Sequence, residues 1–187
     1  VEHKGFNVIF TGNIGQAQGL EILPKAASII RAEGVKDIRF TIVGDGRARE
    51  SFKENITAAG VWDLFEFTGR VKPEEVPGLL AKGDVAFISF ADDELFAKTI
   101  PAKLQSYMAC AMPIVASAKG ETARVISEAE CGMCSDIGDA KELALNIIAM
   151  RNLAKDDLHK MGQNAFEYNK EHFSKKKIMD YLDTFLS

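Results

Sequence analysis

The residues best suited to chemistry in this sequence are glycines and basic residues that follow short apolar runs. Glycine permits positive φ and close approach of the backbone to a ligand, and Lys and Arg bind anions. Together they predict a cleft for a mononucleotide or a nucleoside diphosphate. Tight strand-to-helix turns, which need glycine anyway, are the alternative for any single loop. The loops are 12–19 (GNIGQAQG), 44–47 (GDGR), 69–71 (GRV), 90–103 and 117–121 (SAKGE).

The segment Thr99-Ile100-Pro101-Ala102-Lys103 is the strongest local signal. Proline is favoured at the first helical position, so we expect a helix that opens at Pro101 and runs through Leu104, Tyr107 and Met108. A lysine in a first turn is unfavourable by roughly 0.3–1 kcal/mol. A bound diphosphate at Lys103 would offset this cost, whereas a solvated Lys103 would simply tolerate it.

Two arginines are further candidates. Arg70 follows a glycine at a predicted strand end, which suits contact with a phosphate or a base. Its alternative is a surface ion pair with Glu74 or Glu75. Arg47, after Gly46, leaves the same choice open.

The other reactive side chains do not indicate a metal or catalytic site. We interpret the acidic run Asp92–Glu94 as a solvated loop and expect no metal ion or cofactor, because oxygen clusters in loops are more often hydrated. A lone Cys-x-x-Cys lacks the four ligands of a zinc site, so its cysteines are expected to be small core residues. The histidines lie near the chain ends, far from the predicted loops, and no catalytic residue is assigned. The Cys-x-x-Cys is formed by Cys131 and Cys134, and the third cysteine is Cys110. The histidines are His3, His159 and His172.

The spacing of the first glycines excludes two common nucleotide-binding motifs. Gly12, Gly15 and Gly19 do not form G-x-G-x-x-G, and no G-x-x-x-x-G-K-[ST] occurs. A dinucleotide-dependent dehydrogenase and a P-loop NTPase are therefore disfavoured.

The elements that must position these loops alternate between strands and helices. Helical spacing places Leu20, Leu23, Ala27 and Ile30 on one face, and a later segment, 143–150, has the same spacing. Strand–helix alternation predicts an α/β, Rossmann-like, doubly wound parallel sheet of about six strands. A helical C-terminal tail is expected over 156–186, with Ser174 as a cap and Phe173, Tyr181 and Phe185 partly exposed. The predicted strands are 6–11, 38–43, 64–68, 84–89, 113–116 and 132–135.

Composition fits one ordinary domain of 187 residues, with 47% hydrophobic and 27% charged residues. The net charge of −4 argues against a nucleic-acid partner. No apolar run of 18 or more occurs, and the first residues do not resemble a signal peptide. Three cysteines favour a reducing, cytoplasmic location.

In the order and spacing of these loops, the chain resembles the C-terminal, donor-binding half of family 4 bacterial glycosyltransferases with the B-type fold. Within that family it is similar to surface-polysaccharide N-acetylfucosamine transferases. The segments that carry the resemblance are 10–20 (FTGNIGQAQGL), 42–46 (IVGDG), 67–71 (FTGRV), 100–110 (IPAKLQSYMAC) with 113–116 (PIVA), and 120–124 (GETAR).

The resemblance implies a binding site for a sugar nucleotide. The diphosphate would lie against the first loop and the helix at Pro101, the base against the loops at 44–46 and 70–71, and the ribose near Ser106. The expected donor-binding residues are Gly12, Asn13, Gly15, Gly44, Asp45, Gly46, Arg70, Val71, Thr99, Pro101, Lys103 and Ser106.

The chain departs from the family at four positions. The first-loop arginine and lysine that hold the diphosphate are replaced by Asn13 and Gln18, and the two family glutamates fall at Lys98 and Ser106. Lys103 would supply the missing positive charge. Ser106 can donate one hydrogen bond but cannot accept two as a carboxylate does.

The resemblance further implies that residues 1–187 are the donor domain of a two-domain, retaining glycosyltransferase whose acceptor domain lies outside this sequence. A UDP-sugar is favoured over a GDP-sugar, and a lipid-linked acceptor would place the protein at the inner face of the membrane. The isolated domain is expected to bind nucleotide without turnover. A non-catalytic nucleotide-binding module and half of a sugar-nucleotide epimerase are the alternatives.

Overall fold

The computed structural model describes residues 5–173. Its centre is one parallel sheet of six strands in the order β3-β2-β1-β4-β5-β6. The predicted Rossmann-like sheet is therefore confirmed, and three strands begin one residue later than predicted. The strands are β1 (Phe6–Thr11), β2 (Ile38–Val43), β3 (Phe65–Gly69), β4 (Val85–Ser89), β5 (Ile114–Ser117) and β6 (Gly132–Ser135).

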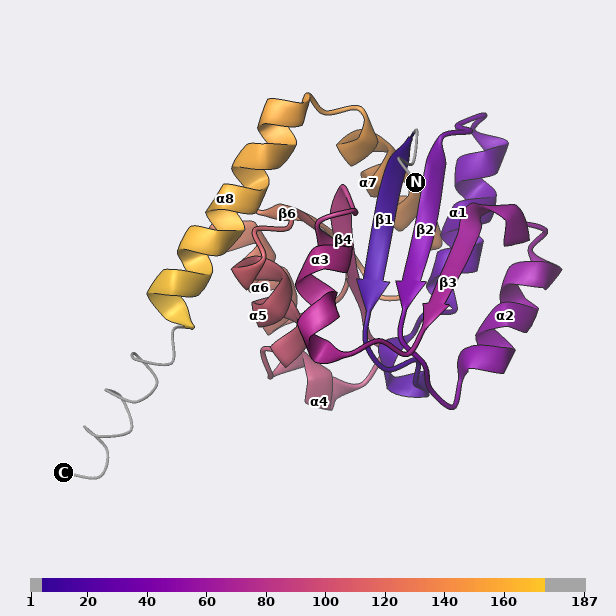
Figure 1. Ribbon diagram of the computed structural model, residues 1–187, viewed down its shortest axis with the longest axis horizontal. Coiled ribbons are helices and arrows are strands. Elements are labelled where there is room, and N and C mark those ends of the chain that lie inside the picture. Colours follow the sequence, from indigo (N-terminus) through magenta and orange to yellow (C-terminus); the bar gives the residue numbers. More distant parts are fainter. Residues whose placement is uncertain (1–4, 174–187) are drawn as a thin grey trace.

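Helices and short 3₁₀ turns connect the strands and cover both faces of the sheet (Figure 1). The α-helices are α1 (Ile22–Ala32), α2 (Arg49–Ala58), α3 (Val76–Leu80), α4 (Glu94–Ala97), α5 (Ala102–Ala109), α6 (Glu121–Ala129), α7 (Ala140–Arg151) and α8 (Lys155–His172). The 3₁₀ turns are η1 (Gln16–Gln18), η2 (Trp62–Leu64) and η3 (Pro73–Glu75).

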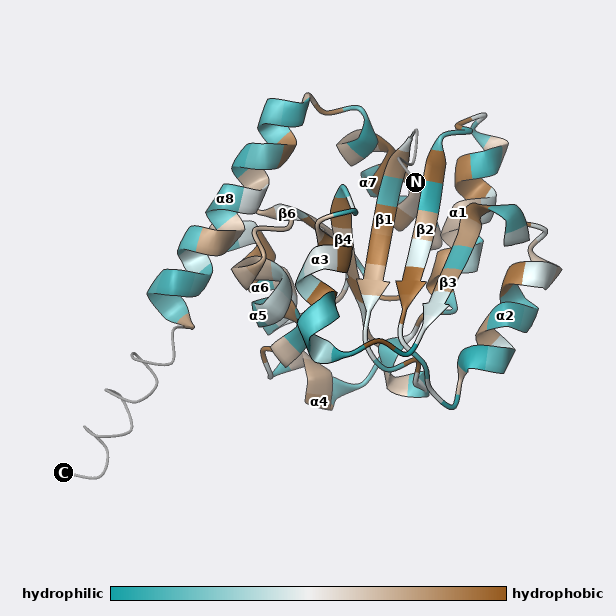
Figure 2. Cartoon of the chain, in the orientation of Figure 1, coloured by the Kyte–Doolittle hydropathy of each residue, from teal (hydrophilic) through white to brown (hydrophobic). Residues whose placement is uncertain are grey.

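Two apolar clusters fill the two faces of the sheet. Alternate residues of a strand point to opposite faces, and in β1 Val8 and Phe10 join the cluster with α1, α2 and α7. Ile9 joins the second cluster, with α3, α5 and α6. Because both faces are covered, β1 and β4 are apolar along most of their length (Figure 2).

The predicted helical spacing proves to mark buried faces. Leu23, Ala27 and Ile30 are fully buried on α1, and Leu143 is fully buried on α7, which packs against α1. Leu20 is also buried, but it precedes α1 rather than belonging to it.

The C-terminal helix predicted over 156–186 is confirmed as far as the structure describes it, as α8. It packs against α5 and α6 through its small residues Gly162 and Ala165. Phe173 is partly exposed, as predicted, and its ring packs beside Tyr168. Ser174, Tyr181 and Phe185 lie outside the described residues. Between residues 5 and 173, no helix is long and apolar enough to cross a membrane.

Candidate functional site

The strand order reverses between β1 and β4, and this reversal places a crevice at their carboxyl ends. In such sheets, ligands bind at this crevice. The arrowheads of β1, β2 and β3 point to the same edge, where α4 also lies (Figure 1). The first loop packs on the end of β4, since the N–H of Ala91 donates to the carbonyl of Ala17 at 3.0 Å and the Ser89 hydroxyl donates to the carbonyl of Gln18.

Glycines join the ends of β1, β2 and β3 side by side. The N–H of Gly12 donates to the carbonyl of Val43 at 2.9 Å, and that of Gly44 donates to Gly69 at 2.9 Å. Gly44 has φ +128°, and a Cβ there would collide with the Gly12 carbonyl. The turn interpretation therefore explains Gly44, whose backbone must approach the first loop. The same contact holds both loops at the edge of the sheet.

A pocket of about 410 Å³ opens beside this row of glycines. It brings together half of the twelve predicted donor-binding residues and adds apolar walls from β2 and from the segment leading into α3. Its lining residues are Thr11, Gly12, Asn13, Val43, Gly44, Asp45, Arg70, Val71, Pro73 and Val76.

Arg70 is exposed at this pocket and has no ion pair among residues 5–173. The alternative interpretation, a pair with Glu74 or Glu75, is therefore wrong. The carboxylate of Glu75 instead accepts the backbone N–H of Lys72 at 2.8 Å, at the start of η3. The Arg70 guanidinium thus stays available for an anion.

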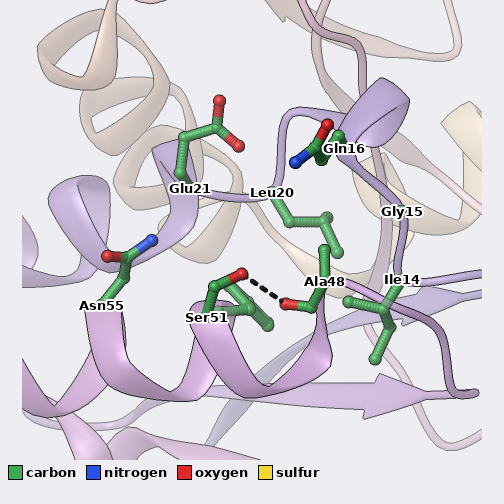
Figure 3. Close-up of a pocket in the computed structure, with 9 residues that line it drawn as sticks. Ile14, Gly15, Gln16, Leu20, Glu21, Ala48, Ser51 and Asn55 are labelled. Carbon is green, nitrogen blue, oxygen red and sulfur yellow. Dashed lines mark hydrogen bonds between the residues drawn. The ribbon is translucent and has the colours of Figure 1, made fainter.

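Gly15 and Gly46 do not line this pocket. Gly46 packs against the Ile14 carbonyl, where a side chain would collide. Gly15 lines two hollows of about 360 and 490 Å³ between the first loop and α2, and Arg47 lines the larger one. In the smaller hollow, polar side chains of the first loop and of α2 face one another, and Ser51 donates to the Ala48 carbonyl at 2.9 Å (Figure 3).

Lys103 crosses from α5 to the end of β1, at the reversal point of the strand order. Its Nζ donates to the Gln18 side-chain oxygen at 3.0 Å and lies 3.9 Å from the centroid of the Phe10 ring. A Cβ on Gly12 would lie 2.9 Å from both Cε and Nζ of Lys103. Burial lowers the pKa of Lys103 from 10.5 to about 7, because the charged form loses its hydration.

The remaining predicted residues lie around the start of α5. Pro101 is the residue that precedes the helix, with φ −70° and ψ 146°, so the prediction of Pro101 as the first helical residue is wrong by one position. The residue before α5 must be extended, and Ala102 opens the helix instead. Thr99 and Ser106 are exposed, and the Ser106 hydroxyl donates to the Ala102 carbonyl at 3.1 Å.

The other reactive side chains have structural contacts. Asp92 pairs with Lys119, and Asp93 caps α4 by accepting the Leu95 N–H at 2.9 Å. Within residues 5–173, no cluster of His, Cys, Asp and Glu has the arrangement of a metal site. Cys131 is buried, as expected of a small core residue, and burial raises its pKa to about 12.

Sequence reasoning missed Phe10 and Tyr107 as parts of the site. Phe10 was expected only in a strand and Tyr107 only in a helix, because their contacts with Lys103 and Thr11 join distant segments. Gln18 was expected only as a replacement for a basic residue, and its contact with Lys103 was not anticipated. No local sequence pattern predicts contacts between such distant segments.

Comparison with known proteins gives a consistent family. Residues 5–152 match the family model described as "Glycosyl transferases group 1". The chain is 30% identical over 190 residues to the "Probable glycosyltransferase WbjE" of Pseudomonas aeruginosa, covering 100% of this chain and 46% of that protein. It is 25% identical over 138 residues to a 2-deoxystreptamine glucosyltransferase of Streptomyces kanamyceticus, covering 74% and 34% respectively. The chain thus spans less than half the length of these relatives.

Solved structures agree on the fold. Sucrose-phosphate synthase from Thermosynechococcus elongatus superimposes with a TM-score of 0.84 at 18% identity, over 100% of this chain and 46% of that one. Anabaena HepE, solved in complex with UDP-glucose, superimposes with a TM-score of 0.79 at 20% identity, over 97% and 49%.

Proposed function

The chain belongs to the group 1 glycosyl transferases, and on that premise we propose that it is the domain that binds the nucleoside-diphosphate sugar donor. The sugar would be transferred to an acceptor in the synthesis of a cell-surface polysaccharide. A second domain of the same enzyme would hold the acceptor. The finer resemblance to N-acetylfucosamine transferases, the retaining mechanism and the location at the inner face of the membrane remain predictions.

One observation carries the proposal. The amine of Lys103 lies at the reversal point of the sheet, next to Gly12, and Gly12 also lines the 410 Å³ pocket with Arg70. Two basic side chains without carboxylate partners among the described residues therefore lie near one concave site, Arg70 in its wall and Lys103 beside the lining residue Gly12. Such an arrangement suits a ligand with two linked phosphates and a planar base.

We propose a part of the ligand for each element around the pocket. We place the base between the loop 44–46 and the residues Arg70 and Val71, and the diphosphate against Asn13, Lys103 and the first turn of α5. The first amides of an α-helix have no acceptor within the helix and favour an anion. Ser106 lies one turn after Lys103 on α5, where it would meet the ribose.

The chemical task of this domain is to stabilise the leaving group. When the glycosidic bond breaks, the sugar develops oxocarbenium character and negative charge grows on the diphosphate. Fixed N–H groups and the two cations would stabilise that charge without reorganising. The group that assists attack by the acceptor would belong to the acceptor domain, so the isolated chain should bind without turnover.

Known proteins of this fold support a UDP-sugar as the donor. HepE has been crystallised with UDP and with UDP-glucose. WaaG, another structure of this fold, is described as a glycosyltransferase involved in lipopolysaccharide biosynthesis, with a TM-score of 0.75 at 15% identity. These descriptions favour UDP over GDP and a polysaccharide product for this chain.

Calorimetric titration of the purified domain with UDP, GDP, UDP-glucose, UDP-N-acetylglucosamine and GDP-mannose tests the proposal. We expect a UDP-sugar to bind more tightly than UDP. A preference for the bare nucleotide would favour a non-catalytic module, and absence of binding at millimolar ligand would overturn the function.

Substitution of Lys103 tests the location of the site. Lys103→Ala should weaken binding of the UDP-sugar by roughly 1.5–3 kcal/mol, the range for a hydrogen bond to a charged group. Lys25→Ala, on the exposed side of α1, is the matched control and should leave the affinity unchanged. Equal affinities for the two variants would remove Lys103 from the site.

A further inference from the structure

Lys103 is held by neutral groups. Its Nζ contacts the side-chain oxygen of Gln18 at 3.0 Å and the face of the Phe10 ring at 3.9 Å. Among residues 5–173, no carboxylate lies within ion-pair distance of this nitrogen. Gly12 completes the surroundings, because any side chain there would occupy the space of Cε and Nζ. We call Phe10, Gly12 and Gln18 the Lys103 cradle.

The elements that form the cradle carry no other charge. The sequences of β1 (FNVIFT), η1 (QAQ) and α5 (AKLQSYMA) hold Lys103 as their only charged residue. Tyr107 is the other titratable side chain on them, and burial raises its pKa to about 12, so it is neutral near pH 7. In the neighbouring loops the carboxylates of Asp92 and Asp45 pair with Lys119 and Arg49, and Arg70 carries a positive charge, which cannot stabilise an ammonium.

Lys103 is half-buried, and removing part of the hydration of an ammonium without supplying an opposite charge is costly and favours the neutral amine. One amide oxygen and one aromatic face compensate for only part of the hydration free energy that the ammonium loses. The pKa of Lys103 shifts accordingly, since burial lowers it to about 7. An incoming phosphate oxygen would supply the missing negative charge and raise this pKa again.

We propose that the Lys103 cradle keeps the side chain as a neutral amine at weakly alkaline pH and that capture of a sugar nucleotide protonates it. The inference rests on the proposed donor-binding function and adds a proton to its binding equilibrium. The lone pair of Nζ takes one proton from the buffer, no other bond forms or breaks, and the resulting ammonium pairs with the pyrophosphate. Phe10, Gly12 and Gln18 are positioning residues, since they act through Lys103.

Calorimetry in two buffers of different ionisation enthalpy measures this proton directly. UDP-glucose is the probe, because its pyrophosphate is a diester and lacks a terminal phosphate group that titrates near pH 6. With a free pKa of about 7, uptake at pH 8 should be close to one proton and at pH 6 close to zero. The affinity should fall by up to about tenfold per pH unit above pH 7.

Three variants separate the roles of the residues. Lys103→Met should bind weakly and take up no proton at either pH. Gln18→Glu places a carboxylate beside Nζ, so the ammonium forms before binding and uptake at pH 8 should disappear. Gln18→Met removes the same amide without adding charge and should retain the uptake. Similar uptake in both Gln18 variants would overturn the role of the cradle.

A measurement without ligand separates this inference from the function itself. In the free domain labelled with ¹³C-lysine, the resonance absent from Lys103→Met should titrate near pH 7. Titration above pH 9 would overturn the inference, as would tight binding of UDP-glucose at pH 8 without proton uptake; the donor-binding function would survive both results. Failure to bind any nucleotide would overturn the function and the proton-coupled capture together, whatever the free pKa.

Discussion

The Tyr107 hydroxyl accepts a hydrogen bond from the backbone N–H of Thr11 at 3.0 Å, and neither residue is exposed to solvent beyond 7%. This contact joins α5 to the last residue of β1 across a separation of 96 residues. Lys103 lies one turn earlier on α5, and Gly12 follows Thr11. The hydrogen bond therefore sets how far the Lys103 side chain reaches over the end of β1.

We expect Tyr107→Phe to lower the free energy of unfolding by about 1–3 kcal/mol, because the buried N–H of Thr11 loses its partner. Urea denaturation followed by circular dichroism measures the change. Tyr168→Phe is the matched control, since its hydroxyl contacts Glu128 in an exposed position, and it should cost less than about 0.5 kcal/mol. Equal losses in the two variants would show that the buried hydrogen bond adds nothing.

Gly44→Ala should lower the free energy of unfolding by more than about 2 kcal/mol, because φ +128° strains an L-residue and the new Cβ collides with the Gly12 carbonyl. The first and second loops would separate, so UDP-sugar binding should weaken as well. Chemical denaturation and calorimetry on the same preparation report both effects.

Gly78→Ala is the control for this change. Gly78 lies within α3 at a negative φ, and a Cβ added there would have no neighbour within 4 Å. Alanine there should raise the free energy of unfolding by up to about 1 kcal/mol. A neutral Gly44→Ala would contradict the close contact of the two loops.

Ser106→Glu should strengthen binding of UDP by roughly tenfold, because a carboxylate on α5 can accept hydrogen bonds from both ribose hydroxyls. Ser106 is exposed, and among residues 5–173 its hydroxyl is hydrogen-bonded only to the Ala102 carbonyl, so the longer side chain has room. Titration calorimetry compares it with Ser127→Glu, an exposed position on α6. No difference between the two variants would mean that the ribose does not lie at Ser106.

The stability of the unliganded domain should depend on pH through Lys103. The folded pKa is about 7 and the ordinary value is 10.5, so between these values the unfolded chain binds more protons. The free energy of unfolding should therefore rise with pH across this window, relative to Lys103→Met, by up to about 1.4 kcal/mol per pH unit. Subtracting the variant removes the contributions of the other lysines. A constant difference from pH 7 to pH 10 would contradict a neutral Lys103.

The strands could be predicted because burial on both faces of the sheet requires a continuous run of apolar residues in the sequence. The run Val85–Ser89 is apolar throughout, as a covered central strand requires. The shifts of one residue in β3, β4 and β5 arise because pairing with a neighbour, which no local pattern contains, decides where a strand begins. The start of α5 was misplaced for a related reason, since proline is also compatible with the extended residue before a helix.

The candidate site was predicted in part. Gly12, Gly44 and Arg70 were expected at one edge because parallel strands end on the same side of a sheet, and they do line one pocket. Gly15 and Gly46 were expected there for the same reason but do not line this pocket, since Gly15 lines hollows on the α2 side of the first loop and Gly46 packs against the Ile14 carbonyl. Loop direction decides this difference, and the hydrogen bonds between loops set that direction.

The sequence by itself determined the alternation of elements, the glycines at the strand ends and the presence of a lysine in the first turn of a helix. These features follow from period, turn chemistry and residue type, which act over a few residues. Only the tertiary structure decided that Lys103 contacts Phe10 and Gln18, with no carboxylate from the described part of the chain beside it. Desolvation and charge pairing depend on the surroundings in space, and the chain creates those surroundings only when β1, η1 and α5 come together.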